Sequence, residues 1–339
     1  MPPMRFAVIG IDHVHVFGMV VALRGAGAEF AAFDALDSPL TAGFAKVFPH
    51  AECVPDRRAI LEDPSIELIV CAAVPDRRAT LGAEAMRHGK DVWVDKPAAL
   101  TRADLDALRE ARSEGDRRLC VYFSERVASR ATERALALVR AGAIGRPLQM
   151  TVLGPHQLGL VPRPDWFWDP RRAGGILVDL ASHAIDQFVC LFGADDVTIA
   201  AAQTANRGHP ERVGFEDVGE VLLRTPEASG YARVDWYTPG GLGTWGDGRL
   251  FVIGSEGSLE VRKYCDPTGR PNGDHLLLVD ERETRYLDCS ADPLPFAAQL
   301  VRDVRERSET AMSAAHALRV SELAIAAQER ATSPIRPAE

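Results

Sequence analysis

The first third of the chain alternates short apolar runs with segments of helical periodicity. The apolar runs predict strands at residues 6–10, 29–33, 66–73, 91–94 and 119–123. Apolar residues at helical spacing predict helices at residues 16–24, 80–88 and 102–113. Strands without polar alternation, separated by helices, are typical of a parallel sheet covered on both faces. Residues 1–125 therefore predict an α/β, doubly wound domain.

Residues 126–339 carry a different pattern. Helices are predicted at about 125–141, 175–192, 295–307 and 313–330, and a strand at 148–152. Further strands are predicted where apolar and polar residues partly alternate, at 218–224, 230–236, 250–253, 258–262, 275–280 and 284–287. Glycine-rich turns separate these runs, as in an antiparallel sheet. The second part of the chain therefore predicts an α+β domain. Whether its C-terminal helices pack on this domain or back on the first one is left open.

Composition and charge place the chain among ordinary globular proteins. The 339 residues are 46% hydrophobic and 26% charged, and at about 150 residues per domain this length favours two domains. The 39 basic and 48 acidic residues leave a net charge of −9, which disfavours nucleic acid as a partner. No apolar run approaches the ~18 residues of a membrane span, and no signal-peptide pattern opens the chain. Six scattered cysteines without a C-x-x-C pair favour reduced thiols, so we expect a cytoplasmic protein without a membrane partner.

The turn after the first strand is the expected dinucleotide site, and its sequence is irregular. Such a turn uses glycine for a tight bend, for approach to the pyrophosphate and for helix packing. Gly10 occupies the first of these positions, whereas Asp12 and His15 stand at the other two. Asp34 ends the second strand, where a carboxylate can bind both ribose hydroxyls, although an ordinary turn or capping aspartate would look the same. No arginine directly follows Asp34 to balance a 2′-phosphate, so NAD is favoured over NADP.

His13 and His15 suggest a metal hypothesis, because side chains two apart on an extended segment point the same way. Asp12 is adjacent, but no neighbouring cysteine or glutamate completes a ligand set at the usual spacing. We therefore predict no metal here and expect both histidines to border the cofactor or substrate cleft.

Two later motifs carry groups suited to catalysis. Lys96 follows Asp95 at the end of the fourth predicted strand, where ligands bind in open α/β sheets. Asp179 and His183 are four residues apart on a predicted helix, so both lie on one face about a turn apart. The alternative for this pair is a partly buried histidine tied to an aspartate for structural reasons.

Together, these motifs resemble the Gfo/Idh/MocA oxidoreductases. The resemblance runs from about residue 5 to residue 330 and includes Gly10, Asp34, Asp95-Lys96-Pro97, Gly145-Arg-Pro147, Trp166-Phe-Trp-Asp169 and Gly174-Gly175-x-x-x-Asp179-x-x-x-His183. It implies a Rossmann domain and an α+β substrate and oligomerisation domain with an open, mostly antiparallel sheet. It also implies NAD(P)-dependent oxidation or reduction of a sugar, cyclitol or related polyol, by a homodimer or homotetramer that pairs through that sheet.

The resemblance also gives roles to individual residues. His183 would take the hydroxyl proton, because an imidazole titrates near neutral pH. Lys96 would hold the reacting oxygen and favour its negative charge, and Asp179 would hydrogen-bond a neighbouring substrate hydroxyl and help set the protonation of the other two. The residues expected to contact the cofactor are Gly10, Asp12, His13, Asp34, Pro75, Asp95 and Lys96.

Several residues depart from the usual pattern of this family. Asp95 stands where glutamate is common, and the segment 74–79 keeps only Pro75 and an aspartate from a usual Thr-Pro-Asn-x-x-His. These changes bear on cofactor contacts more than on the catalytic residues. Two alternatives therefore stay open: an NAD-assisted lyase or glycosidase of the same family, and a non-redox binding protein that has lost the cofactor.

Substrate contacts are expected from His15 and from the segment before the Gly-Gly pair. That segment contributes His156, Arg163 and Trp166, and aromatic faces beside hydrogen-bonding groups suit sugar rings. Trp166 and Trp168 could equally pack beneath the helix, and Arg163 could instead select a carboxylated sugar through a bidentate contact.

Overall fold

The computed structural model describes residues 2–34, 38–160 and 162–333, and it divides into two compact units. The first unit comprises Met1–Tyr122 and Pro295–Ser321, and the second comprises Phe123–Leu294 and Glu322–Glu339. Residues 295–321, assigned by the sequence to the second domain, thus belong to the first unit, which is the option left open for the C-terminal helices.

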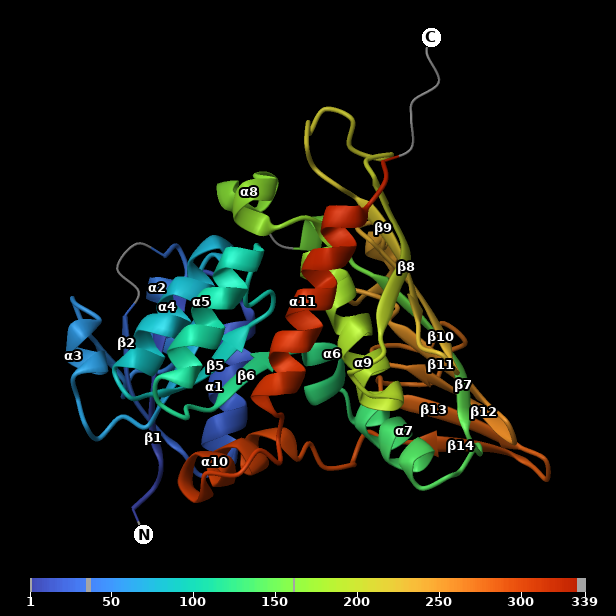
Figure 1. Ribbon diagram of the computed structural model, residues 1–339, viewed down its shortest axis with the longest axis horizontal. Coiled ribbons are helices and arrows are strands. Elements are labelled where there is room, and N and C mark those ends of the chain that lie inside the picture. Colours follow the sequence, from blue (N-terminus) through green and yellow to red (C-terminus); the bar gives the residue numbers. More distant parts are fainter. Residues whose placement is uncertain (1, 35–37, 161, 334–339) are drawn as a thin grey trace. The chain divides into compact units, whose positions relative to one another are not determined.

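A six-stranded parallel sheet forms the centre of the first unit (Figure 1). Its order is β3-β2-β1-β4-β5-β6, which confirms the predicted doubly wound arrangement. The strands are β1 (Arg5–Ile11), β2 (Glu29–Asp34), β3 (Glu52–Cys53), β4 (Leu68–Ala72), β5 (Asp91–Asp95) and β6 (Leu119–Tyr122). The order reverses between β1 and β4, and ligands of such folds bind beyond the carboxyl ends of the strands at this point.

Helices cover this sheet. They are α1 (His15–Gly25), α2 (Thr41–Val47), α3 (Arg58–Leu61), α4 (Pro75–Arg87), α5 (Arg102–Ser113) and α10 (Phe296–Glu306). The helix α4 packs against β4, β5 and α5, whereas α1 contacts β2, β4 and α10. The sequence did not predict α2, α3 or β3, which are short, and it began α4 five residues late. Pro75 is the first residue of α4, where its fixed φ suits the helix and its missing N–H costs nothing.

An eight-stranded sheet lies in the second unit, with the strand order β14-β13-β12-β11-β7-β10-β9-β8. Its strands are β7 (Pro147–Pro155), β8 (Thr198–Ala205), β9 (Val218–Arg224), β10 (Ser229–Asp235), β11 (Arg249–Gly254), β12 (Gly257–Arg262), β13 (His275–Asp280) and β14 (Thr284–Asp288). Neighbours are antiparallel except β7 and β10, so the mostly antiparallel sheet is confirmed, although β8 was not predicted. Alternate residues of β7, such as Met150 and Val152, are buried.

The helices of the second unit are more broken than the sequence predicted. They are α6 (Ser124–Val127), α7 (Arg130–Arg140), α8 (Pro170–Ala173) and α9 (Ser182–Phe192), and α11 (Ala314–Arg330) has residues in both units. The helix predicted at 125–141 is interrupted at Ser129, whose hydroxyl caps α7 by accepting a hydrogen bond from the Thr132 N–H at 3.3 Å. In Figure 1, α7 and α9 lie beside the sheet, where α7 contacts β12 and β13, and α9 contacts β7.

The approach to α9 is a π-helical turn at Leu177–Ala181, not the regular helix expected from residue 175. Gly175 has a φ of +85°, and a Cβ there would meet the Gln328 side chain at 2.6 Å. Gln328 accepts a hydrogen bond from the Leu177 N–H at 3.0 Å. The stretch Pro170–Phe192 is long and apolar enough to cross a membrane by composition, but 72% of its apolar window is buried inside the protein, as in a core helix.

Candidate active site

The turn between β1 and α1 keeps the geometry of a nucleotide-binding turn at Gly10. This glycine has a φ of +76°, and a Cβ on it would stand 2.5 Å from the Ala73 Cβ. The negative charge of Asp12 is tied to the β4–α4 connection, because its carboxylate accepts a hydrogen bond from the Val74 N–H at 3.2 Å. The helix α1 then begins without an acidic residue in its first turn. Since the N–H groups at a helix start favour anions, this turn fits a dinucleotide pyrophosphate.

The two histidines of this turn converge on one buried carboxylate. His15 Nδ1 lies 2.8 Å from Asp95 Oδ1, and His13 Nδ1 lies 2.8 Å from Asp95 Oδ2. Asp95 is fully buried, whereas the two imidazoles keep 20–26% of their side-chain surface. An ionised carboxylate can only accept hydrogen bonds, so a neutral His15 ring donates from Nδ1 and is left with Nε2 as an acceptor.

Arg78 completes this cluster, although no motif in the sequence singles it out. Its Nη2 lies 3.0 Å from Asp95 Oδ2, and its Nε donates to the Ala73 carbonyl at 2.7 Å. The side chain is 1% exposed, although it follows the exposed Arg77 in the same helix. The unusual residues of the turn, of β5 and of α4 thus belong to a single network, formed by His13, His15, Arg78 and Asp95 and called here the Asp95 network.

The protonation of the Asp95 network follows from burial and charge. Burial alone would raise the pKa of Asp95, but the Arg78 guanidinium and the two imidazoles outweigh it and hold that pKa well below its usual range. Burial lowers the pKa of His13 to about 4, with His15 acting in the same direction and Asp95 opposing it. At neutral pH, Asp95 is therefore ionised and paired with Arg78, and His13 is neutral.

The same cluster has the spacing of a metal site. Ligand atoms of His13, His15 and Asp95 lie within 4.8 Å of one another. The Arg78 guanidinium, however, already balances the carboxylate charge, so an added cation would meet repulsion in a buried place. That this turn holds no metal stays a prediction.

The remaining candidates of the first unit lie at the same edge of its sheet. Asp34 ends β2 and pairs with Ile9 of β1, which places it beside the carboxyl end of the central strand. Pro75 is buried at the start of α4. Lys96 follows β5, is 4% exposed, and donates its backbone N–H to Asp95 Oδ1 at 2.8 Å. The predicted cofactor residues are thus brought together at the switch point of the sheet.

His183 and Asp179 lie in the second unit, on the helical stretch that enters α9. His183 is the second residue of α9, is 2% exposed, and meets the Phe123 ring edge-on, with the ring centres 6.4 Å apart. Asp179 belongs to the π-helical turn and is half-buried. Asp179 and His183 therefore do not share the regular α-helical face expected from their spacing, because a π turn is wider than an α turn. Such turns are frequent at functional sites.

A buried polar chain supports the backbone of His183. The Gln187 side-chain amide donates to the His183 carbonyl at 2.9 Å, and Lys263 Nζ donates to Gln187 Oε1 at 3.2 Å. Lys263 also lies 2.6 Å from Glu125 Oε2, and both of these charged side chains are almost fully buried. The sequence missed this chain, since its members lie on α6, on α9 and just after β12.

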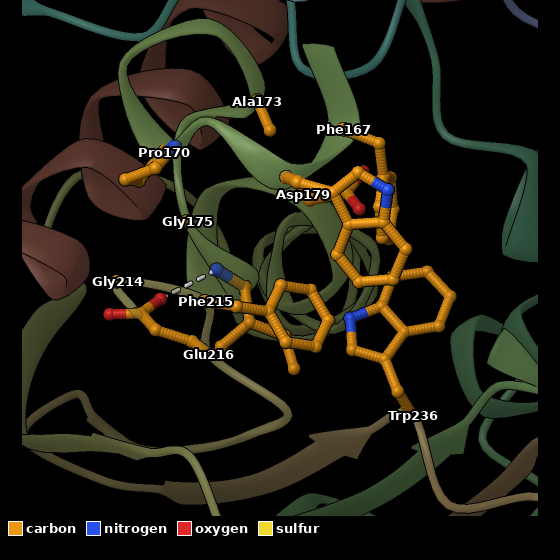
Figure 2. Close-up of a pocket in the computed structure, with 11 residues that line it drawn as sticks. Phe167, Pro170, Ala173, Gly175, Asp179, Gly214, Phe215, Glu216 and Trp236 are labelled. Carbon is orange, nitrogen blue, oxygen red and sulfur yellow. Dashed lines mark hydrogen bonds between the residues drawn. The ribbon is translucent and has the colours of Figure 1, made fainter. Parts of the chain in front are cut away.

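A pocket with aromatic walls lies beside Asp179 (Figure 2). Its aromatic residues are Phe167, Trp168, Phe215 and Trp236. The rings contact one another, with 5.3 Å between the centres of Phe167 and Trp236. Glu216 also lines the pocket, but its carboxylate accepts hydrogen bonds from the Ile176 N–H at 2.8 Å and from Gln328. Aromatic faces beside a carboxylate suit a ring with an apolar face and hydroxyl groups on its edge, although the pocket's volume of about 30 Å³ admits only the edge of such a ring.

None of the four predicted substrate residues, His15, His156, Arg163 and Trp166, lines this pocket, although three of them pack against its aromatic walls. His156 packs between Trp236 and Trp245, with ring centres 5.4 and 4.5 Å away, and Trp166 contacts Phe167 at 6.3 Å. Neither His156 nor Trp166 is among the residues that line the pocket. His15 lies in the first unit, in the Asp95 network.

Two family models match the chain. Residues 4–123 match the oxidoreductase family with an NAD-binding Rossmann fold, and residues 132–260 match the GFO/IDH/MocA C-terminal domain. The chain belongs to the Gfo/Idh/MocA oxidoreductase family. The expected resemblance, the Rossmann fold and the second-domain fold are thereby confirmed.

Individual members of the Gfo/Idh/MocA family agree with this assignment. A crystal structure from Erwinia carotovora atroseptica SCRI1043 shares 39% identity, covers 98% of this chain and 99% of that chain, and has a TM-score of 0.94. An uncharacterized oxidoreductase of Schizosaccharomyces pombe is 25% identical over 67% of this chain and 61% of its own length, so the match spans less than two thirds of that relative. Inositol 2-dehydrogenase 2 of Saccharopolyspora erythraea is 27% identical over 78% of this chain and 74% of its own length.

Proposed function

We propose that this Gfo/Idh/MocA protein is an NAD-dependent dehydrogenase or reductase that acts on a hydroxyl-bearing carbon of a sugar, cyclitol or related polyol. The observation that carries the proposal is the Asp179 carboxylate at the edge of an aromatic pocket. A carboxylate accepts hydrogen bonds from vicinal hydroxyls, and the aromatic walls cover the apolar face of a ring. The name of the inositol dehydrogenase relative points to the same substrate class.

Three side chains would carry the proton and the charge. His183 is proposed to take the hydroxyl proton, and its backbone is held by Gln187 in a buried setting. Lys96 is proposed to hold the reacting oxygen as an ammonium group, which favours negative charge on that oxygen. Asp179 is proposed to orient a neighbouring hydroxyl. Bound NAD would supply the hydride acceptor.

NAD is proposed in preference to NADP because of Asp34. Its carboxylate stands at the end of β2, where it can bind two ribose hydroxyls and would repel a 2′-phosphate. The segment that follows it, residues 35–37, lies outside the described residues. A cytoplasmic location and a homodimeric or homotetrameric assembly also belong to this proposal.

The proposal is tested by NADH formation over a panel of neutral and acidic polyols. We expect the full chain to reduce NAD with at least one of them. The variants His183→Asn and Lys96→Met should each lose at least about a hundredfold in kcat while the unfolding midpoint stays within a few degrees. Arg77→Gln, an exposed change in the same unit as Lys96, serves as the control and should keep full activity.

The same panel separates the alternatives. Product formation without net NADH would indicate the NAD-assisted lyase or glycosidase. Full activity in His183→Asn would remove His183 from the mechanism, and a chain that binds neither nucleotide would contradict the dehydrogenase outright.

A further inference from the structure

Arg163 is held as a flat, partly dehydrated cation in the second unit. Its guanidinium carbon lies 4.8 Å from the centre of the Phe167 ring and 4.9 Å from the centre of the Trp236 ring. Its Nε donates to the Leu158 carbonyl at 3.0 Å, and its Nη2 donates to the Gln157 carbonyl at 3.2 Å. Two aromatic faces and two backbone carbonyls therefore fix the plane of this group before any ligand arrives.

The charge of Arg163 is incompletely balanced. Burial lowers the pKa of Arg163, and the attraction of Asp179, which acts in the opposite direction, does not offset that burial. Both carbonyl partners are neutral groups. A further anion beside the guanidinium would therefore stabilise it, since a dehydrated cation gains most from a charged partner.

A second pocket opens on the side of Arg163. It is lined by Leu158, Gly159, Pro162, Arg163, Trp168 and His209, so the described lining residues include two basic groups and no acidic one. His209 Nδ1 lies 3.1 Å from Asp217 Oδ2, which orients its ring. The guanidinium of Arg212 lies 4.2 Å from the centre of the Trp168 ring and adds a third basic group nearby. With a volume of about 510 Å³, the pocket is large enough for a small organic anion.

The two pockets differ in charge and share one wall. The pocket beside Asp179 has acidic groups, Asp179 and Glu216, and the pocket beside Arg163 has basic ones. Trp168 lines both of them. A ligand that spans Trp168 would thus meet a hydroxyl-binding carboxylate at one end and an anion-binding guanidinium at the other.

We propose that the substrate is an anionic sugar or cyclitol, whose carboxylate or phosphate binds Arg163 while its hydroxyls face Asp179. This inference rests on the proposed function, because it specifies the substrate class of the same enzyme. Carboxylate and phosphate share the chemistry that a guanidinium fork recognises, and Arg163 is the residue that would select them.

The test measures binding with matched, ring-locked probes. The full chain, saturated with NADH, is titrated calorimetrically with methyl β-D-glucoside, methyl β-D-glucuronide and methyl β-D-glucoside 6-phosphate, and with the galacto forms of all three. None of these probes has a free aldehyde for NADH to reduce. We expect an anionic member to bind at least about tenfold more tightly than its neutral parent, as one charge-assisted hydrogen bond allows. The preferred anion distinguishes a carboxylate from a phosphate substrate.

Variants identify the residue responsible. Arg163→Gln should lose the anion preference, and Arg163→Lys, which keeps the charge without the planar fork, should keep only part of it. Both variants should keep the affinity for the neutral glycoside. Arg171→Gln is the matched control, because Arg171 lies in the same segment with its side chain 88% exposed. Equal weakening of neutral and anionic probes would show that Arg163 only secures its loop and would overturn the proposal. Anionic probes that bind no better than neutral ones would also overturn it, whereas failure to bind NADH would instead refute the proposed function.

Discussion

Arg78 Nη2 lies 3.0 Å from Asp95 Oδ2, and the two side chains are 1% and 0% exposed. The guanidinium also donates to the Ala73 carbonyl at 2.7 Å and to the Pro97 carbonyl at 3.3 Å. One buried cation therefore joins the segments that follow β4 and β5, where predicted cofactor residues lie. His13 and His15 of the β1–α1 turn contact the same carboxylate, so the unusual turn and the unusual strand end depend on each other.

Removing Arg78 should destabilise the first unit strongly. In Arg78→Met the Asp95 carboxylate stays buried without its cation, which costs about 3–5 kcal/mol. Urea unfolding of the full chain measures this loss. The adjacent Arg77→Met, at an exposed position, should change stability by less than about 0.5 kcal/mol. Equal stability of the two variants would show that Asp95 does not depend on Arg78, and Arg78→Met with Asp95→Asn should recover part of the loss.

The depressed pKa of His13 predicts a pH dependence of stability. Folding lowers this pKa from 6.5 to about 4, so between these values the unfolded chain binds more protons than the folded one. Stability should therefore fall as the pH drops from about 6.5 to about 4, by roughly 3 kcal/mol from this group, and show no contribution from it above 6.5.

Urea unfolding at pH 4.5, 5.5 and 7.5 isolates that contribution. His13→Asn should lose less stability on acidification than the wild type, whereas His88→Asn, on the exposed end of α4, should follow the wild type. Parallel pH profiles for His13→Asn and the wild type would contradict the protonation state assigned to the Asp95 network.

Gly10 should tolerate no side chain. Gly10→Ala places a Cβ 2.5 Å from the Ala73 Cβ at a φ of +76°, so either the turn or β4 must shift. We expect a loss of about 2 kcal/mol or more in the free energy of unfolding, together with weaker NAD binding. Gly25→Ala, at a position with open space for a Cβ, is the control and should be neutral or slightly stabilising.

The sequence predicts the long, strongly patterned elements of this fold and misses the irregular ones. Continuous apolar runs predict β1, β4, β5 and β6 to within a few residues. Strands that are buried on both faces need apolar residues at successive positions, which makes them easy to recognise. The helix α2 and the two-residue β3 lack the length for a clear period. The π-helical turn before α9 follows from contacts of Gly175 and Leu177 with Gln328, more than 150 residues away, which no local pattern reveals.

The sequence likewise predicts some residues of the candidate site and misses others. Gly10, Asp34, Lys96 and Asp179 stand in motifs with their own local signature, so the sequence finds them. Arg78 carries no such signature, since one exposed and one buried arginine look alike in the pair Arg77-Arg78. The pocket walls Phe215 and Trp236 come from segments distant from Asp179, and only the folded sheet brings them beside it.

The central claim, that this altered turn still binds NAD in a redox enzyme, is tested most directly by calorimetric titration of the full chain with NAD and NADP. We predict saturable binding of one NAD per chain, binding of NADP at least about tenfold weaker, and loss of this discrimination in Asp34→Ala. Absence of binding by both nucleotides would contradict the account.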